Sequence, residues 1–435
     1  MELVPGFVAL LQGLSMTMTK PTFESFTTIA CGWVLASRRT ITRMILAAGE
    51  SAEKHFSSYH RLFSQASWSL DGLGLAVFDL IEPWIDGETL LALDDTLARK
   101  RGRRIFGVGM HHDPLISSRG YAVLNWGHSW VVLGVIVELP FRKGHSFCLP
   151  ILFRLYLNKQ KAQQHRRVYR TRPELAVAML QRLCGRHETR RFHVVADSAY
   201  GGQSVLNHLP TNCNLTSRLL LDARLYEAPR ERKPGQRGRP RRRGEQLRSP
   251  REMLAERCQR VEFDLYGRTE RARLADCQAR VYAVPERPLR VVAVAPLSGG
   301  RPQQAFYSTH ADALAEEVIL WYARRWSVEA TFHDSKQQLG FEQPQGWSRK
   351  AVERTAPVAM LLYSLIVLWF AKAGHRQYQP LECPWYVSKT EPSFADMLAT
   401  LRRLSVRQKI NELGLTGPGS RKIKMLLENT FAIAV

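Results

Sequence analysis

Three acidic residues occupy positions from which carboxylates could bind a metal ion. Asp94 ends the apolar run of residues 90–93, and Asp197 ends the run of residues 193–196. A carboxylate at the end of a buried strand is held firmly and still reaches the sheet edge, where open α/β sheets bind ligands. An aspartate at a strand end also commonly starts a turn, so neither residue is decisive alone. The third residue, Glu329, lies in a segment with helical features.

Glu329 shares its segment with a tyrosine and two basic residues. The chain has no proline or glycine from residue 321 until Gly340, which predicts one helix that ends at this glycine. At about 100° per residue, one face about 60° wide carries four side chains: Tyr322, Arg325, Glu329 and Lys336. An exposed ion-pair stripe would explain Arg325 and Glu329, which are four residues apart, but it would not require the tyrosine.

The spacing of these four residues resembles the Y-R-E-K signature of DDE transposases from bacterial insertion sequences. Residues 94–96 (Asp-Asp-Thr) and residues 197–201 (Asp-Ser-Ala-Tyr-Gly) resemble the first and second acidic motifs of the same family. The resemblance covers roughly residues 85–345. It implies an α/β fold with an RNase H-like mixed sheet flanked by helices, interrupted by a β-rich insertion between the second aspartate and the glutamate.

The resemblance implies that Asp94, Asp197 and Glu329 are catalytic and bind metal. Two divalent ions about 3.5–4 Å apart can stabilise the attacking and the leaving oxygen at phosphorus, and hard carboxylate oxygens suit Mg²⁺. We therefore expect two Mg²⁺ ions, with Mn²⁺ as a substitute, and carboxylates that raise one another's pKa without metal. Asp95 competes with Asp94 for this role, but the family pattern places the ligand two residues before Thr96.

By the same resemblance, Tyr322, Arg325 and Lys336 contact phosphates near the cleaved DNA end. An arginine can bind a phosphate bidentately, a lysine acts as a point charge, and a tyrosine offers a hydroxyl and a stacking face. Relatives form a DNA hairpin with a flipped base. The sequence does not identify the tryptophan that would stack on it, because three nearby ones could equally pack in the core: Trp321, Trp326 and Trp347.

The charge of the chain indicates a polyanionic partner, and nucleic acid is the commonest one. The net charge of +23 is concentrated in four segments, and the rest of the chain is net neutral. These segments are residues 99–104, 159–172, 229–251 and 395–435. Because Arg99, Lys100 and Arg101 follow the first acidic motif directly, we expect them to contact the DNA backbone close to the reaction.

The largest basic segment contains a candidate minor-groove motif. Residues 236–240 (Gln-Arg-Gly-Arg-Pro) resemble the core of an AT-hook, an extended segment that lies in a narrow minor groove. The alternative is a solvated basic loop, and both interpretations hold if the loop orders on DNA. Five arginines are therefore predicted to bind DNA: Arg237, Arg239, Arg241, Arg242 and Arg243.

One further motif invites a metal interpretation. Residues 111–113 read His-His-Asp. Adjacent residues of an extended chain point to opposite sides, so these side chains would not share one ion. We expect a loop beside the active site instead.

The distribution of helix and strand signals predicts five regions. Residues 37–44 could form the second helix of a helix-turn-helix or an ordinary amphipathic helix. The expected regions are a helical DNA-binding region (1–85), the first part of an RNase H-like catalytic domain (86–218), a β-rich insertion with a basic loop (219–310), the second part of the catalytic domain (311–375) and a basic helical C-terminal region (376–435).

The cysteines and the longest apolar run bear on the compartment. The seven cysteines are scattered without a C-x-x-C pair, which fits a reducing cytosol. Residues 356–371 are uncharged, but they are fewer than the ~20 that span a bilayer. We therefore expect a buried core helix rather than a membrane helix, and a cytoplasmic protein without a membrane partner.

These features predict a bacterial DNA transposase that works at the nucleoid. It would bind double-stranded DNA at the inverted terminal repeats of its element, cut these ends with metal ions and join them to target DNA by cut-and-paste transposition. Because two ends must be cut and joined in concert, we expect a homodimer in the synaptic complex. The alternative is a catalytically silent DNA-binding protein derived from a transposase, against which the intact acidic residues argue.

Overall fold

The structure is a computed structural model that describes residues 3–113, 116–118, 120–230, 241–265, 268–297, 300–380 and 391–412. Its strands are β1 (Thr89–Arg99), β2 (Gly109–His112), β3 (Leu124–Glu138), β4 (Ser146–Tyr156), β5 (Phe192–Ala196), β6 (Cys213–Leu219), β7 (Leu225–Tyr226), β8 (Gln246–Leu247), β9 (Gln259–Leu265), β10 (Arg268–Val281), β11 (Leu289–Pro296) and β12 (Gln304–Ser308).

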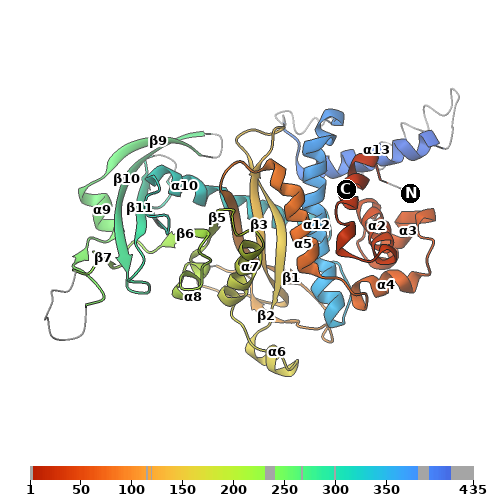
Figure 1. Cartoon of the computed structure of the whole chain (residues 1–435), viewed down its shortest axis with the longest axis horizontal. Coiled ribbons are helices and arrows are strands. Elements are labelled where there is room, and N and C mark those ends of the chain that lie inside the picture. The colour runs from red at the N-terminus through yellow and green to blue at the C-terminus, as the bar shows by residue number, and fades with distance from the viewer. Residues whose placement is uncertain are drawn as a thin grey trace.

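The helices precede, interrupt and follow these strands. They are α1 (Pro5–Gln12), α2 (Lys20–Leu35), α3 (Ile41–Ala48), α4 (Phe56–Ser64), α5 (Leu70–Ile81), α6 (Lys159–Gln164), α7 (Arg172–Arg186), α8 (Gln203–Leu206), α9 (Pro250–Glu256), α10 (Ala315–Arg324), α11 (Trp326–Gln337), α12 (Arg349–Lys372) and α13 (Phe394–Glu412). Figure 1 shows the central strands between the N-terminal helices at one end and β9, β10 and β11 at the other.

The described strands form one mixed sheet. Its order is β2-β3-β1-β5-β6-β12-β11-β10-β7-β8, with β4 paired to β3 and β9 paired to β10. β1 runs antiparallel to β3 and parallel to β5, and β5 runs parallel to β6. The central strands are almost continuously apolar and buried, as expected for strands that are covered on both faces. The mixed α/β sheet with flanking helices expected from the sequence is confirmed.

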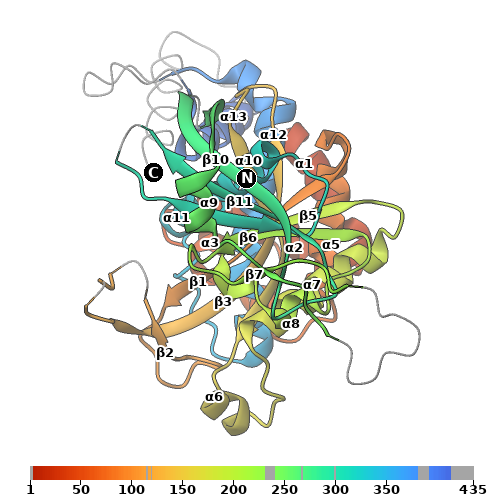
Figure 2. The same ribbon diagram turned by 90° about the vertical axis from the view of Figure 1, so that its left-hand side faces the viewer.

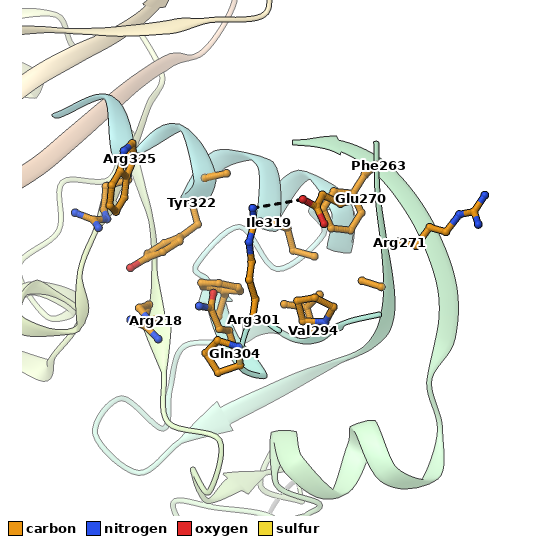
Figure 3. A pocket seen from close by; sticks show the side chains of 16 residues that line it. Arg218, Phe263, Glu270, Arg271, Val294, Arg301, Gln304, Ile319, Tyr322 and Arg325 are labelled. Atoms are coloured by element: carbon orange, nitrogen blue, oxygen red, sulfur yellow. Dashed lines mark ion pairs between the residues drawn. The ribbon is translucent and has the colours of Figure 1, made fainter. Parts of the chain in front are cut away.

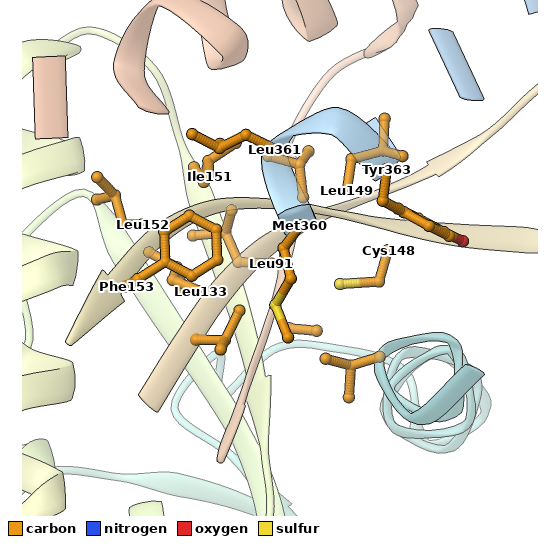
Figure 4. Packing of buried hydrophobic residues seen from close by; sticks show 14 of the residues in the cluster. Leu91, Leu133, Cys148, Leu149, Ile151, Leu152, Phe153, Met360, Leu361 and Tyr363 are labelled. Atoms are coloured by element: carbon orange, nitrogen blue, oxygen red, sulfur yellow. The ribbon is translucent and has the colours of Figure 1, made fainter. Parts of the chain in front are cut away.

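Helix α12 is the central helix of the core. Its length and composition would allow it to cross a membrane, but 94% of its most apolar window is buried inside the protein. Met360, Leu361 and Tyr363 of this helix pack against apolar side chains of β1, β3 and β4 (Figure 4). The Ser364 hydroxyl also donates a hydrogen bond to the Pro150 carbonyl of β4 at 3.0 Å. The burial agrees with a core helix over residues 356–371.

The segment after β6 extends the same sheet. β12 returns antiparallel to β6, and β11 and β10 follow in order. These strands also carry a small apolar cluster of their own, in which Leu274, Val292 and Phe306 pack with Val318 and Ile319 of α10. Figure 2 views this end of the molecule and shows α6 and β2 projecting away from it. Strands therefore follow the second acidic motif and continue the central sheet, while the bounds of an insertion domain remain a prediction.

The N-terminal helices dock onto the segment that follows α11. Trp33 of α2 donates its indole N–H to the Leu339 carbonyl at 2.9 Å, and the backbone N–H of Arg39 donates to Gln343 Oε1 at 2.6 Å. Residues 37–40 form the turn between α2 and α3, and α3 begins at Ile41. A role of α3 in reading DNA remains a prediction.

Two helical glycines test how tightly the helices pack on the sheet. A methyl group at Gly74 of α5 would overlap the Ile151 carbonyl of β4, whereas a methyl group at Gly185 of α7 would meet no described atom within 4 Å. We expect Gly74→Ala to lower the free energy of unfolding by ~1–3 kcal/mol. Gly185→Ala, the control, should raise it by up to ~1 kcal/mol through helix propensity. Urea unfolding of both variants measures this, and equal stability of the two variants would contradict the packing.

Candidate active site

Asp94 and Asp197 lie side by side where β5 ends, but Asp94 is in the middle of β1, which continues to Arg99, and not at the strand end that the sequence predicts. Leu93 of β1 pairs with Ala196 of β5, so the next residue of each strand is one of these aspartates. The negative charge of Asp197 raises the pKa of Asp94, which places the two carboxylates within electrostatic reach. Asp197 Oδ1 also accepts the Ala199 N–H at 2.9 Å and starts a 3₁₀ turn. This aspartate is therefore both a turn starter and a strand-end carboxylate.

Asp94 and Asp95 have different partners, as expected for adjacent residues of a strand. Asp94 Oδ2 lies 2.6 Å from Arg325 Nη1. Asp95 instead accepts the Tyr200 hydroxyl at 2.8 Å and lies 3.4 Å from Arg172 Nε. Asp94 is thus the aspartate that faces the segment containing Glu329.

The segment from residue 321 to 336 is not the single helix that its lack of proline and glycine predicts. It divides into α10 and α11 at Arg325. The turn tightens there, because Arg325 N–H donates to Tyr322 O at 3.1 Å and Val328 N–H donates to Arg325 O at 3.0 Å, both three residues apart. The Ser327 hydroxyl donates a hydrogen bond to the Arg324 carbonyl at 2.8 Å. A side chain therefore occupies a carbonyl that a backbone N–H would use in a continuous helix.

Arg325 connects two of the carboxylates. Its Nη1 donates to Asp94 Oδ2 at 2.6 Å, and its Nη2 donates to Glu329 Oε1 at 2.9 Å. Its guanidinium carbon lies 5.5 Å from the centre of the Tyr322 ring. The structure therefore brings together four of the residues singled out from the sequence, Tyr322, Arg325, Glu329 and Asp94, with Asp197 beside Asp94.

Burial dominates the electrostatics of this site. It raises the pKa of Asp94 to about 7, although Arg325 opposes the rise, and Asp197 and Asp95 add to it. Burial also raises the pKa of Asp95 against the opposing effects of Arg172 and Tyr200. The negative charges of Asp197 and Asp95 thus raise the pKa of Asp94, but their effect is smaller than that of burial.

Lys336 and Lys100 lie near residues 342–344, away from the carboxylates that Arg325 connects. Burial lowers the pKa of Lys336, while Glu342 and Asp113 oppose the change. Lys100 Nζ donates to the carbonyls of Glu342 and Pro344 at 2.8 and 3.0 Å, and burial lowers its pKa to about 8. Lys100 thus fastens the 342–344 segment to β1, while Lys336 belongs to this neighbourhood rather than to the Arg325 bridge.

Asp113 pairs with an arginine. Its Oδ2 accepts Arg99 Nε and Nη2 at 3.0 and 2.8 Å and Asn125 Nδ2 at 2.7 Å. His111 and His112 lie in strand β2 and not in the loop that the sequence predicts. His111 is buried and His112 is exposed, so the two imidazoles point to opposite sides of the strand. Arg101, which follows Lys100, is exposed.

A cleft of about 650 Å³ opens beside the carboxylates. Tyr322, Arg325 and Trp326 line one part of it, and side chains of β6 and of the strands after it line the rest (Figure 3). Arg218 faces it from β6, and Arg301 forms an ion pair with Glu270 at 3.4 Å. The cleft combines aromatic faces with positive charge, a combination suited to nucleic acid.

The three candidate tryptophans have different surroundings. Trp326 lines the cleft and is 58% exposed. Trp321 packs against the imidazole of His193, with ring centres 4.0 Å apart, and near His310. Trp347 is exposed. Of the three, Trp326 therefore has the position to stack on a base in the cleft.

The arginines predicted to bind DNA in the basic loop are partly described. Arg237 and Arg239 lie outside the described residues. Arg241 and Arg242 line a hollow of about 710 Å³ next to α8. Arg243 lies over two rings, 4.8 Å from the centre of Tyr226 and 4.4 Å from that of Tyr282, so it contributes to packing as well as to charge.

The donor chemistry of the site fits a hard divalent cation, but the carboxylates are not gathered around one point. Asp94, Asp197 and Glu329 offer the oxygen ligands that Mg²⁺ prefers. Across the described ranges, no group of three His, Cys, Asp or Glu side chains is close enough to hold a metal ion. Arg325 stands between Asp94 and Glu329 instead.

Comparison with protein families agrees with this site. The sequence profile of the DDE superfamily endonucleases matches residues 18–279, more than half of the chain. The chain therefore belongs to the DDE superfamily endonucleases. The matched range includes Asp94 and Asp197 and ends before Glu329. A comparison with curated proteins finds no match.

Two residues that position the site were not singled out from the sequence. Tyr200 holds Asp95, and Arg172 approaches the same carboxylate while lying 4.4 Å from the centre of the Tyr156 ring. Tyr200 stands inside the second acidic motif, so its place in that motif was an available signal. Arg172 was visible only as one charge of a basic segment.

The raised pKa of Asp94 predicts a pH dependence of stability. Between the unfolded value of 3.8 and about 7, the folded carboxyl keeps a proton that the unfolded chain releases, so stability falls as pH rises through this window. Asp94→Asn cannot ionise. Without metal, its melting temperature should therefore rise relative to wild type between pH 4.5 and 7.5.

Asp222→Asn is the control, because a hydrogen bond from Arg251 lowers the pKa of Asp222. Its melting temperature should not rise relative to wild type in the same window. Thermal denaturation in EDTA measures both variants. A constant difference between Asp94→Asn and wild type across the window would contradict the buried ionisation.

Proposed function

We propose that the chain is a DNA transposase of the Y-R-E-K type that binds the inverted terminal repeats of its element, cuts these ends and joins them to target DNA. The proposal rests on three carboxylates, Asp94, Asp197 and Glu329, which lie near one another, although not around one point, in a DDE superfamily endonuclease. Leu93 and Ala196 set the first two side by side, and Arg325 ties the third to Asp94. The charge of +23 and the aromatic, basic cleft support a DNA substrate.

In this proposal Asp94, Asp197 and Glu329 would hold two divalent ions, Mg²⁺ or Mn²⁺, which supply an activated attacking oxygen and stabilise the leaving oxygen. The other groups act on the DNA itself. Tyr322 offers its hydroxyl and Arg325 its guanidinium to phosphates in the cleft, and Trp326 offers an exposed ring for a displaced base. Lys336 adds positive charge farther along α11.

The basic residues outside the cleft would guide the flanking duplex. Arg101 is exposed directly after β1, and Arg241 and Arg242 line the hollow beside α8. We propose that Arg237 and Arg239 continue this path. Two ends must be cut and joined together, so the working form in this proposal is a homodimer on paired ends, in the bacterial cytoplasm at the nucleoid.

Cleavage of end DNA tests the carboxylates. With Mg²⁺, each of Asp94→Ala, Asp197→Ala and Glu329→Ala should cut a terminal duplex at less than about one hundredth of the wild-type rate, since even groups behind metal ligands cost ~10–100-fold. DNA affinity, measured by fluorescence anisotropy, should stay within a few-fold of wild type.

The exposed Asp222, which pairs with Arg251 at 2.7 Å, gives the matched control. Asp222→Ala should cleave normally. Undiminished cleavage by any of the three site variants would remove that residue from the site. A wild-type chain that binds the duplex and never nicks it would favour the catalytically silent alternative.

Salt dependence tests the basic path. Removing two phosphate contacts with Arg241→Gln and Arg242→Gln should make the log-log salt slope of DNA binding shallower by ~1.8. Arg186→Gln is the control, because Arg186 pairs with Asp79 at 2.8 Å and lies outside the four basic segments. An unchanged slope in the double variant would show that the hollow beside α8 is off the DNA path.

A further inference from the structure

Arg325 occupies the carboxylate oxygens that a shared metal ion would need. Asp94 Oδ1 already accepts the Asp95 backbone N–H at 2.8 Å, and Oδ2 accepts Arg325 Nη1 at 2.6 Å. Glu329 Oε1 accepts Arg325 Nη2 at 2.9 Å. An ion of the Mg²⁺ type binds its oxygens at about 2.0–2.1 Å. An ion and the guanidinium therefore cannot both lie between these two carboxylates.

The pairing of Arg325 with Asp94 and Glu329 stabilises the protein when DNA is absent. The Asp94 carboxylate is largely buried, and a buried negative charge is costly unless a cation neutralises it. The other nearby arginine, Arg172, approaches Asp95. Arg325, whose side chain is only 13% exposed, is therefore the counterion of Asp94 on the side that faces Glu329.

The cleft offers Arg325 a second position. Arg325 lines it together with Tyr322 and Arg218. Its Nε is buried and finds no hydrogen-bond partner among the described residues, so the guanidinium has a donor to spare. A DNA phosphate in the cleft would present several acceptor oxygens, and arginine binds phosphate bidentately.

We infer that Arg325 is a positioning residue that couples metal binding to DNA binding. In the DNA-free protein it holds Asp94 and Glu329 apart from metal, and on DNA it moves to a phosphate in the cleft and frees both carboxylates. This inference rests on the proposed function. Since linkage is reciprocal, DNA should raise metal affinity by the same factor by which metal raises DNA affinity.

Metal affinity without DNA is the direct test. Mn²⁺ binding to the full chain is followed by electron paramagnetic resonance of the free ion, a readout that needs no turnover. We expect Arg325→Gln to bind Mn²⁺ at least about tenfold more tightly than wild type, within the usual range of coupling between sites. Arg325→Lys keeps the charge but cannot donate to both carboxylates in the same fork, so it should also bind more tightly.

The neighbouring arginine provides the matched control. Arg324 belongs to the same helical segment but pairs with Glu138 at 2.7 Å, so Arg324→Gln should keep the wild-type Mn²⁺ affinity. Wild-type affinity in Arg325→Gln would overturn the inference. Tighter binding in Arg325→Gln with wild-type affinity in Arg325→Lys would also overturn it, because charge alone would then explain the effect.

Addition of DNA completes the test. Calorimetric titration with Ca²⁺ in place of Mg²⁺, with and without a duplex of the terminal sequence, should show at least about a tenfold gain in wild type and little gain in Arg325→Gln. Equal gains in both would overturn the inference.

A last variant separates this inference from the proposed function. Asp94→Asn combined with Arg325→Gln should lose the tight Mn²⁺ binding. If Asp94→Asn left the Mn²⁺ affinity unchanged, both in wild type and in Arg325→Gln, Asp94 would not belong to the metal site, and the coupling inference would be overturned with it. If Asp94 mattered while Arg325 did not, only the coupling would be overturned.

Discussion

The parallel pairing of β1 with β5 is the constraint on which the site depends. Because Leu93 and Ala196 share one register position, Asp94 in the middle of β1 and Asp197 after the last residue of β5 lie side by side. The glutamate reaches them from a different layer. Its helix, α11, is fixed to β4 by the Thr331 hydroxyl, which donates to the Cys148 carbonyl at 2.8 Å. The core around α12 holds β4 in turn, so the third carboxylate depends on packing far from the reaction.

Local patterns were sufficient to find Asp197 after its strand, the mixed sheet and the buried helix near residue 360, but they placed Asp94 at a strand end when β1 continues to Arg99. They were insufficient wherever a distant partner decides the conformation. The expected single helix is divided into α10 and α11 by local and distant interactions: the Ser327 hydroxyl binds a helix carbonyl, and the Arg325 side chain pairs with both Asp94 and Glu329. The ties of Lys100 to the carbonyls of residues 342 and 344 join segments more than two hundred residues apart, and no periodicity encodes them.

The positive charge of the chain is also less free than its total implies. Arg99 is paired with Asp113, the ammonium of Lys100 is bound by carbonyls, and Arg243 lies against two tyrosine rings. Each belongs to a basic segment, yet each also stabilises the fold. A net charge therefore indicates the kind of partner, while only the structure separates charges that face solvent from charges that hold strands and loops together.

Hydrogen bonds join the strands after the second aspartate to the backbone around that aspartate. β6 contributes Ser217, whose hydroxyl donates to the Asp197 carbonyl at 2.8 Å, and β12 pairs Tyr307 with Ser217. The Tyr307 hydroxyl donates to the Gly201 carbonyl of the same turn. Bending or twisting these strands would therefore also move the Asp197 backbone, because the hydrogen bonds connect the two. Exchange of the segment between relatives would preserve the site only if Tyr307 and its register on β6 were carried along.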